Sequence, residues 1–308
     1  MVWLLIVALL ADSMDAPAAS SFRVPLAAAE SLAVETAGAG EPVVLIPGLF
    51  GSQFGFRKIV PLLNAAGYRT IVIEPLGIGS SSRPEHADYS LFAQAGRIAG
   101  VLDSLRIDHA LVIGHSMGAA EAFRLAYRRP DLVWGLVAVE GGPTEAAVTP
   151  MFRRALKFAP WIKLFGGIRL IRLRTRSMLI TSSGDSTWVT DEVVTGYTAG
   201  AARNLDATLK AYIAMANSRE PERLAPHLVQ VHCPVRLLVG GAPHDGGVNP
   251  PEVELLQRVV GAFSVDSVPG AGHFLHEERP EAVVEALARV QASLRALHQR
   301  TRPPSLPS

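Results

Sequence analysis

The sequence predicts an α/β protein in which a mostly parallel central sheet is flanked by helices and interrupted by an inserted helical cap. Short apolar runs alternate with helical stretches over residues 43–139 and again over residues 235–290, which is typical of parallel strands connected by helices. Residues 142–232, between these two parts, are predicted to be helical and to form the cap. Because the 308 residues contain no linker that separates two cores, residues 23–141 and 233–298 are expected to form one body.

The third observation that predicts this fold is a Gly-x-Ser-x-Gly motif at residues 114–118. Residues 109–113 predict a buried strand and residues 117–127 a helix, so Ser116 lies on a sharp turn between them. Such a turn lifts a serine hydroxyl out of the sheet, and Gly114 and Gly118 leave room for the chain on either side. An ordinary glycine-rich turn is the alternative, but this setting favours a nucleophile.

A serine hydroxyl needs a base within hydrogen-bond reach, and His273 is the candidate. It follows a strand-like run at residues 264–268, in a glycine-rich loop before a helix that is predicted to begin near residue 279 or 280. This places it at the carboxyl edge of the sheet. His276 is predicted to be a surface residue that approaches the helix, and His244 is the only other histidine with a similar position after a strand.

Two carboxylates could orient the base. Asp245 follows the apolar run 235–239 and the loop GGAPHDGG, and Glu140 follows the apolar run 136–139. The chain order serine, acid, histidine favours Asp245, although an aspartate in such a loop can instead be a solvated turn residue. Asp245 is therefore the predicted acid, and Glu140 is kept as the alternative.

Backbone N–H groups in a glycine-rich loop can stabilise a developing oxyanion. Residues 43–46 predict a short buried strand, after which Pro47 and Gly48 open a turn. The N–H groups of Leu49 and Met117 are then expected to form an oxyanion hole. A loop that merely reverses the chain direction is the alternative for this segment.

From about residue 43 to about residue 290, the order of these motifs resembles the α/β-hydrolase superfamily. The resemblance rests on four sequences: PGLFGS (47–52), EPLGIGSSSRP (74–84), GHSMG (114–118) and GAGHFLHEERP (270–280). Pro47 stands where many members have histidine, and Glu74 where many have aspartate. The loop that contains Asp245 is about one residue longer than the common form. This difference concerns the assignment of the acid and not that of the nucleophile.

The resemblance implies a serine hydrolase of the esterase and lipase-like branch, which cleaves an ester or lactone with an apolar acyl part. Members that open epoxides or displace halide carry aspartate at the elbow, so Ser116 argues for acyl transfer. Some dehalogenases take their acid from the strand end that matches Glu140. A hydrolase of carbon–carbon bonds or a cofactor-free perhydrolase would use the same triad. A ligand-binding protein without activity is the alternative from another class, which an intact triad disfavours.

No cofactor or metal is expected, because the sequence has no P-loop and no dinucleotide fingerprint, and HEERP (276–280) lacks the second histidine of a zinc helix. The net charge of +1 gives no indication of a nucleic-acid partner. Residues 146–184 contain no acidic residue but many Lys, Arg and aromatic residues. We expect a solvated cap face whose apolar side closes the acyl pocket; contact with an anionic amphiphile or membrane surface is the alternative.

The two ends of the chain and its single cysteine bear on the compartment. Residues 2–11 are apolar but too short to span a bilayer, and small residues follow at 16–18. Residues 1–22 therefore predict a signal peptide or N-terminal anchor, although no Lys or Arg precedes the run. The sequence favours export to the periplasm or medium over a cytoplasmic location. Cys233 is expected to be a buried thiol, and residues 299–308 a disordered tail.

Overall fold

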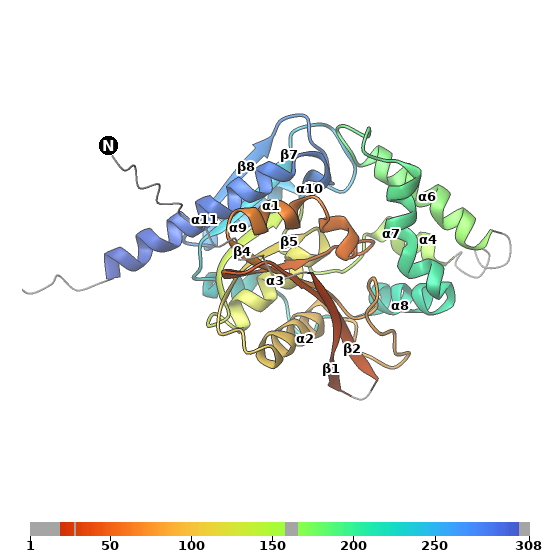
Figure 1. Ribbon diagram of the computed structural model, residues 1–308, viewed down its shortest axis with the longest axis horizontal. Coiled ribbons are helices and arrows are strands. Elements are labelled where there is room, and N and C mark those ends of the chain that lie inside the picture. The colour runs from red at the N-terminus through yellow and green to blue at the C-terminus, as the bar shows by residue number, and fades with distance from the viewer. Residues whose placement is uncertain (1–18, 28, 158–165, 302–308) are drawn as a thin grey trace, which may run out of the picture.

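The computed structural model describes residues 19–27, 29–157 and 166–301, and its centre is an eight-stranded sheet (Figure 1). The strand order is β1-β2-β4-β3-β5-β6-β7-β8. Strands β1 and β2 form an antiparallel hairpin, and β2 pairs antiparallel with β4. The neighbouring strands β4, β3, β5, β6, β7 and β8 all pair in parallel. The strands are β1 (Ser20–Ala27), β2 (Glu30–Ala37), β3 (Glu41–Ile46), β4 (Tyr68–Glu74), β5 (Ala110–His115), β6 (Val133–Val139), β7 (Val235–Gly240) and β8 (Phe263–Val268). The mostly parallel sheet predicted from the sequence is confirmed.

Helices cover both faces of this sheet, so its central strands are apolar on both sides. Along β3, Val43 and Leu45 pack into one core cluster, whereas Val44 and Ile46 pack into the other, as the two-residue repeat of a strand requires. One face carries α2 (Leu91–Ser104), α3 (Met117–Arg128) and α9 (Pro250–Val259); the other carries α1 (Ile59–Ala65) and α11 (Pro280–Thr301). Parallel strands buried in this way present their carboxyl ends at one edge.

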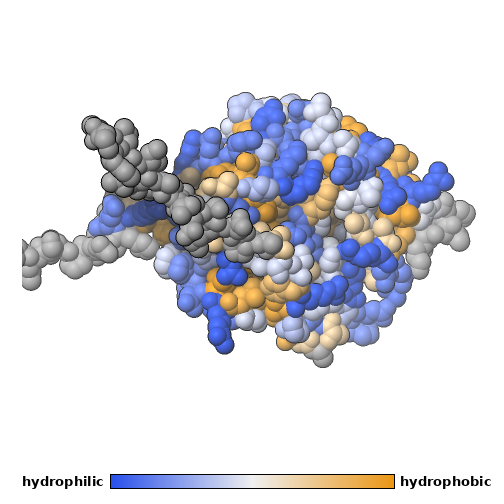
Figure 2. Space-filling view, viewed as in Figure 1, coloured by the Kyte–Doolittle hydropathy of each residue, from blue (hydrophilic) through white to orange (hydrophobic). Residues whose placement is uncertain are grey.

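Between β6 and β7 the described residues form four further α-helices, which we term the inserted helices: α4 (Pro150–Leu156), α6 (Gly167–Thr181), α7 (Asp191–Arg203) and α8 (Leu205–Asn217). They form a layer at the right of Figure 1, with both hydrophobic and hydrophilic residues on the face seen in Figure 2. Part of the predicted basic stretch, residues 158–165, lies outside the described residues. Within the described ranges, the remaining short helices are η1 (Gln53–Phe56), η2 (Ala225–Gln230) and α10 (Leu275–Glu278).

Helix α7 contacts the loops at the carboxyl ends of β3 and β4 with its backbone. A Cβ atom at Gly196 would lie 2.4 Å from the Phe54 ring, and one at Gly200 would lie 2.6 Å from the Gly79 carbonyl oxygen. At the end of the helix, the Arg203 guanidinium donates a hydrogen bond of 2.7 Å to the Ser80 hydroxyl. Glycines four residues apart therefore let α7 lie directly on the core.

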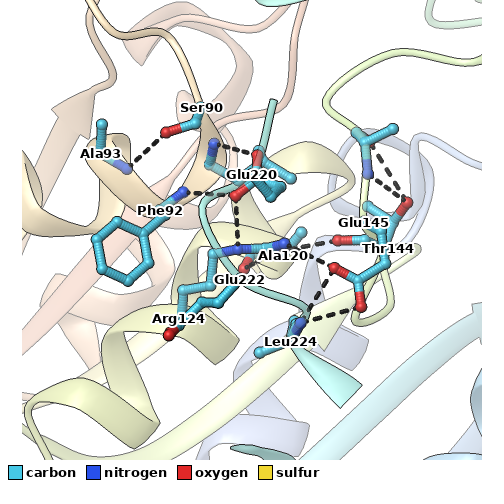
Figure 3. A network of polar contacts seen from close by, with 12 residues as sticks. Ser90, Phe92, Ala93, Ala120, Arg124, Thr144, Glu145, Glu220, Glu222 and Leu224 are labelled. Carbon is cyan, nitrogen blue, oxygen red and sulfur yellow. Dashed lines mark hydrogen bonds and ion pairs between the residues drawn. The ribbon is translucent and has the colours of Figure 1, made fainter. Parts of the chain in front are cut away.

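The buried guanidinium of Arg124 joins both ends of the insertion to helix α3 (Figure 3). It donates to the Thr144 carbonyl at 3.1 Å and to the Glu145 carboxylate at 3.4 Å, just after β6. Its Nε lies 3.3 Å from the Glu220 carboxylate, just after α8. Glu220 in turn accepts hydrogen bonds from the N–H groups of Leu91 and Phe92 in the first turn of α2, where a carboxylate is favourable.

One turn before Arg124, the carboxyl group of Glu121 is fully buried, and neither of its oxygens has a hydrogen-bond partner. Burial raises the pKa of this carboxyl well above its ordinary value; the nearby Arg124 opposes that rise and Glu220 adds to it. The folded state thus favours the protonated form. The stability that this proton provides is complete below the ordinary pKa of 4.5 and is lost as the pH rises through the folded-state pKa.

Glu121→Gln is therefore expected to stabilise the protein relative to wild type, increasingly as the pH rises above 4.5. The gain should be about 1.4 kcal/mol in the free energy of unfolding for each pH unit between 4.5 and the folded-state pKa, because glutamine does not titrate. Urea unfolding across a pH series measures it, with Glu281→Gln on the exposed start of α11 as the control. A gain that does not depend on pH would contradict this account of Glu121.

The structure describes part of each end of the chain. Residues 2–11, the predicted signal-peptide core, lie outside the described residues, and β1 begins at Ser20. Helix α11 includes residues 299–301 of the predicted tail, and residues 302–308 are outside the description. Cys233 as a residue is partly exposed, but burial raises the pKa of its thiol to about 12. No helix in the described ranges is both long and apolar enough to cross a membrane.

Candidate active site

Ser116 sits on a strained turn between β5 and α3, as the sequence motif predicts. Its backbone has φ 52° and ψ −120°, a conformation rare for residues other than glycine. A Cβ at Gly114 would lie 2.6 Å from the Gly118 carbonyl oxygen, and one at Gly118 would lie 2.3 Å from the Ile46 carbonyl oxygen. Only glycine fits at either place. The Ser116 side chain does not cap the helix that follows, so its hydroxyl is available for chemistry.

The loop after β3 contacts this turn directly. A Cβ at Gly48 would lie only 3.0 Å from the Cβ of Ser116, and Leu49 is buried beside it. Met117 is the first residue of α3, and the N–H groups of a first helical turn have no partner inside the helix. The structure thus brings the loop of Leu49 and the start of α3 together at the serine.

Glu74, at the end of β4, holds the loop after β3 against the loop after β4. Its buried carboxylate accepts hydrogen bonds from the N–H groups of Gln53, at 2.8 Å, and Ser80, at 2.5 Å. Burial raises the pKa of this carboxyl, while the two N–H groups oppose the rise. A Cβ at Gly79 would overlap the carboxylate. The Glu74 carboxylate therefore supplies the acceptors that connect the two loops.

His273 lies in the loop between β8 and α10, as predicted, and its side chain is 13% exposed. Its backbone N–H donates a 2.7 Å hydrogen bond to the Ser182 carbonyl, at the end of α6. The Glu278 carboxylate accepts from the N–H groups of Gly272 and Gly184, at 3.0 and 2.9 Å. The histidine loop is thus fixed to the inserted helices on both sides of the imidazole.

Glu140 is the carboxylate that lies beside His273. It is buried at the carboxyl end of β6, with its Oε2 atom 3.7 Å from Nδ1 of His273. Its Oε1 accepts a short hydrogen bond from the Gly240 N–H at the end of β7. Glu140 also has a positive φ of 47°, so the ends of β5 and β6 both carry backbone strain, which is common at functional sites.

Asp245, the acid favoured by chain order, is placed differently. It is exposed on the loop after β7 and makes no hydrogen bond within the described part of the chain. What that loop presents to His273 is backbone: a Cβ at Gly246 would lie 3.4 Å from Nδ1 of His273. The structure therefore brings His273 together with Glu140, the alternative acid, and not with Asp245.

His244, the neighbour of Asp245, also contacts Glu140. Its Nε2 atom lies 3.1 Å from Oε2 of Glu140, and its Nδ1 atom lies 2.7 Å from the Ala242 carbonyl oxygen. Burial lowers the pKa of His244, but the hydrogen bonds to Ala242 and Glu140 outweigh it and raise the pKa overall. One carboxylate oxygen thus faces two imidazoles, an arrangement for which the sequence offers no local signal.

Two further histidines line the back of the site. His115 Nε2 donates to the His273 carbonyl oxygen at 3.0 Å; burial, together with His276 and His273, lowers the pKa of its imidazole well below the ordinary value. The prediction that His276 lies at the surface is wrong. Helix α10 packs on η1 and buries its ring 4.2 Å from that of His115, and burial lowers its pKa to about 3. Both rings are neutral at physiological pH.

An aromatic cluster joins the loop after β3 to the inserted helices. The ring of Phe50 lies 4.9 Å from that of Phe152 in α4 and 5.6 Å from that of Tyr212 in α8, edge to face in both cases. Burial raises the pKa of Tyr212 to about 12, so its ring stays neutral. Since Phe50 follows Leu49 directly, this apolar surface begins one residue from the expected oxyanion hole.

Comparisons with known proteins agree with this arrangement. The family model described as alpha/beta hydrolase fold matches residues 41–167. The chain is 26% identical over 255 residues to the sn-1-specific diacylglycerol lipase ABHD11 of Mus musculus, a match that covers 80% of this chain and 79% of that protein. It is 30% identical over 202 residues to the 2-hydroxy-6-oxo-6-phenylhexa-2,4-dienoate hydrolase of Burkholderia cepacia, covering 64% and 66%.

Among solved structures, the fold is similar to that of a thermophilic esterase from Thermogutta terrifontis. The TM-score is 0.71 at 22% identity, and the match covers 89% of this chain and 99% of that chain. At this identity the likeness concerns the fold. The relatives therefore share one architecture while their names indicate several different hydrolytic reactions.

Proposed function

The chain belongs to the α/β-hydrolase superfamily, and we propose that it is a serine hydrolase that cleaves a carboxylic ester or lactone through an acyl-enzyme. The observation that carries the proposal is the strained turn at Ser116, which lies between the Leu49 loop and the strand end that bears Glu140. A strained serine whose side chain is not used in structure is expected where its hydroxyl reacts.

In the proposed mechanism, His273 is the general base. Its Nε2 takes the proton of the Ser116 hydroxyl as Oγ attacks the ester carbonyl, and the N–H groups of Leu49 and Met117 stabilise the oxyanion. His273 then gives the proton to the leaving alcohol, and a water activated in the same way releases the acid. The buried imidazoles of His115 and His276 are poor alternatives, because burial lowers the pKa of each.

For the acid we propose Glu140 in place of Asp245. A carboxylate supports the base by accepting a hydrogen bond from Nδ1–H, which leaves the lone pair on Nε2 and stabilises the imidazolium. Glu140 is buried 3.7 Å from this nitrogen, a distance that a small adjustment of the ring would turn into a hydrogen bond; catalytic hydrogen bonds are often long without substrate. Asp245 is exposed to solvent.

Labelling with a fluorophosphonate tests the serine, because this reagent reacts with an activated serine without the natural substrate. Wild-type protein is expected to be labelled, and Ser116→Ala is expected to lose all labelling. Ser104→Ala, at the exposed end of α2, is the matched control. Folded wild type that is not labelled would contradict the proposal and favour a ligand-binding protein without activity.

The proposed substrate has an apolar acyl part, which the cluster of Phe50, Phe152 and Tyr212 would contact. A relative named as a diacylglycerol lipase is consistent with such a substrate. Phe152→Ala is expected to lower the preference for an octanoyl over an acetyl p-nitrophenyl ester by about tenfold, through the loss of roughly 1.4 kcal/mol of apolar contact.

Kinetics on both esters measure this preference as a ratio of kcat/KM values. Phe92→Ala, in α2 and stacked on Arg128, is the control and should leave the ratio unchanged. An equal fall in kcat/KM for both esters with Phe152→Ala would mean that the ring supports the fold and does not bind the acyl chain.

A hydrolase of carbon–carbon bonds is the second candidate, favoured by the 30% identity to a dienoate hydrolase. Both reactions would use Ser116, so labelling does not separate them. A comparison of kcat/KM values separates them. A kcat/KM that is higher for a vinylogous diketone acid than for every ester in a chain-length series would favour carbon–carbon cleavage.

A further inference from the structure

Three groups that commonly bind metal ions meet at the carboxyl edge of the sheet. They are Oε2 of Glu140 from the end of β6, Nε2 of His244 from the loop after β7, and Nδ1 of His273 from the loop after β8. Oε2 lies 3.1 Å from Nε2 and 3.7 Å from Nδ1, and all three atoms lie within 4.8 Å of one another. Two imidazoles and a carboxylate form a ligand set typical of zinc.

The hydrogen bonds of His244 prepare it to be a ligand. A carbonyl oxygen only accepts, so Nδ1 of His244 carries the proton that is donated to Ala242. The hydrogen bond to Glu140 is made by a proton on Nε2; when a metal ion displaces that proton, the lone pair on Nε2 points to the same side as Glu140. Histidines that bind metals nearly always donate their other N–H to a carbonyl or carboxylate in this way, which fixes the ring and its tautomer.

The third group is a buried nitrogen without a partner. Nδ1 of His273 has no hydrogen bond in the described structure, although it is directed at the carboxylate that His244 also contacts. A tetrahedral Zn²⁺ with bonds of about 2.0–2.1 Å holds its ligand atoms roughly 3.4 Å apart. The two separations from Oε2 of Glu140, 3.1 and 3.7 Å, lie on either side of that value. The two nitrogens lie within 4.8 Å of each other, so the imidazole rings would turn toward a common point when the ion binds.

A cavity gives access to this cluster from outside. Its volume is about 410 Å³, and its lining includes Glu140, His244 and Gly247, with the exposed carboxylate of Glu254. A metal ion needs an entry path and, with three protein ligands, a fourth position for water. The cavity provides both on the side of Glu140 and His244.

We propose that Glu140, His244 and His273 bind a divalent zinc-like cation, and that the bound ion inhibits the enzyme. When the lone pair of Nδ1 is bound to the ion, the proton of the neutral His273 ring is on Nε2, and Nε2 cannot accept the Ser116 proton. Glu140 is occupied at the same time. This inhibition rests on the proposed function, whereas the binding itself does not.

Calorimetric titration of Zn²⁺ into the full-length Ser116→Ala protein tests binding without any catalytic activity. We expect one ion per chain, and His244→Ala in the same background should weaken binding by about 10–100-fold or more, since even supporting residues of metal sites have effects of that size. His232→Ala is the control, because this histidine is exposed just before β7. Absence of binding, or binding that His244→Ala does not change, would overturn the proposal.

Inhibition is measured on the enzyme with Ser116 present, as ester hydrolysis with increasing Zn²⁺, each variant relative to its own rate in chelator. The wild type and His232→Ala should be inhibited at the concentrations at which the ion binds, and His244→Ala only at about 10–100-fold higher ones. Binding that leaves hydrolysis unchanged would overturn the inhibitory role. If no ester is hydrolysed, the proposed function fails, and the calorimetric result still decides the binding site.

Discussion

Glu140→Gln is expected to lower kcat for ester hydrolysis by about 10⁴-fold, the loss typical when a triad carboxylate becomes an amide. Asp245→Asn is expected to leave kcat nearly unchanged, because this side chain is exposed and forms no hydrogen bond in the described structure. The two substitutions make the same chemical change at the two candidate acids, so each serves as the control for the other.

The large effect of Glu140→Gln has a specific cause in the tautomer of His273. The carboxylate at 3.7 Å can only accept, so it favours a proton on Nδ1 and a lone pair on Nε2. An amide that turns its NH₂ group toward the imidazole would favour the reverse, with the proton on Nε2, and the base would be lost. Because glutamine keeps the size of the side chain and an oxygen for the Gly240 N–H, the fold should survive.

Steady-state kinetics with a p-nitrophenyl ester measure both variants, and circular dichroism checks their folding. We expect the loss in kcat with little change in KM, since in the proposed mechanism Glu140 acts through the base and does not contact the ester. A variant Asp245→Asn that loses 10³-fold or more, while Glu140→Gln stays active, would restore the acid favoured by chain order and reject Glu140.

The sequence located the serine because every feature that defines its position is local. A strand, a turn with two glycines and a helix follow one another within residues 110–128, so the periodicity of neighbouring residues is sufficient. The position of His273 was predicted for the same reason, from a strand, a glycine-rich loop and a helix. The parallel sheet followed from the repetition of such units.

The acid could not be decided in this way, because it depends on contacts between distant segments. Glu140 and His273 are 133 positions apart, and both candidate acids follow strands that end at the same edge of the sheet. What separates them is that Glu140 is buried beneath the Gly240 N–H whereas Asp245 is exposed. The burial of His276 and the position of His244 also depend on packing between loops and carry no local pattern.

The β1–β2 hairpin is the part of the fold that the sequence analysis missed. Of the eight residues of β1, only Val24 is fully buried, so the strand lacks the apolar run that marks the central strands. It lies at the edge of the sheet and pairs antiparallel with β2. Edge strands with one solvated face give a weak apolar signal, which explains why alternation was recognised only from residue 43 onward.

Arg124→Met is expected to lower the free energy of unfolding by about 3–5 kcal/mol, the usual effect of removing one partner from a buried ion pair. The side chain of Arg124 is 2% exposed, and methionine would fill much of its volume but donate nothing. Glu220 would keep its hydrogen bonds to Leu91 and Phe92, yet its negative charge would lose its buried cation. The Thr144 carbonyl would lose its donor as well.

Arg128→Met, one turn further along α3, is the matched control. Arg128 donates to the Phe92 carbonyl and stacks on the Phe92 ring, but it is only half-buried, so about 1 kcal/mol or less is expected. Urea unfolding measures both variants. Equal effects would mean that Arg124 acts only through packing. Arg124 lies on the helix that begins beside Ser116, and its side chain binds both ends of the insertion. Arg124→Met should therefore also reduce activity at temperatures below unfolding, whereas Arg128→Met should leave activity unchanged.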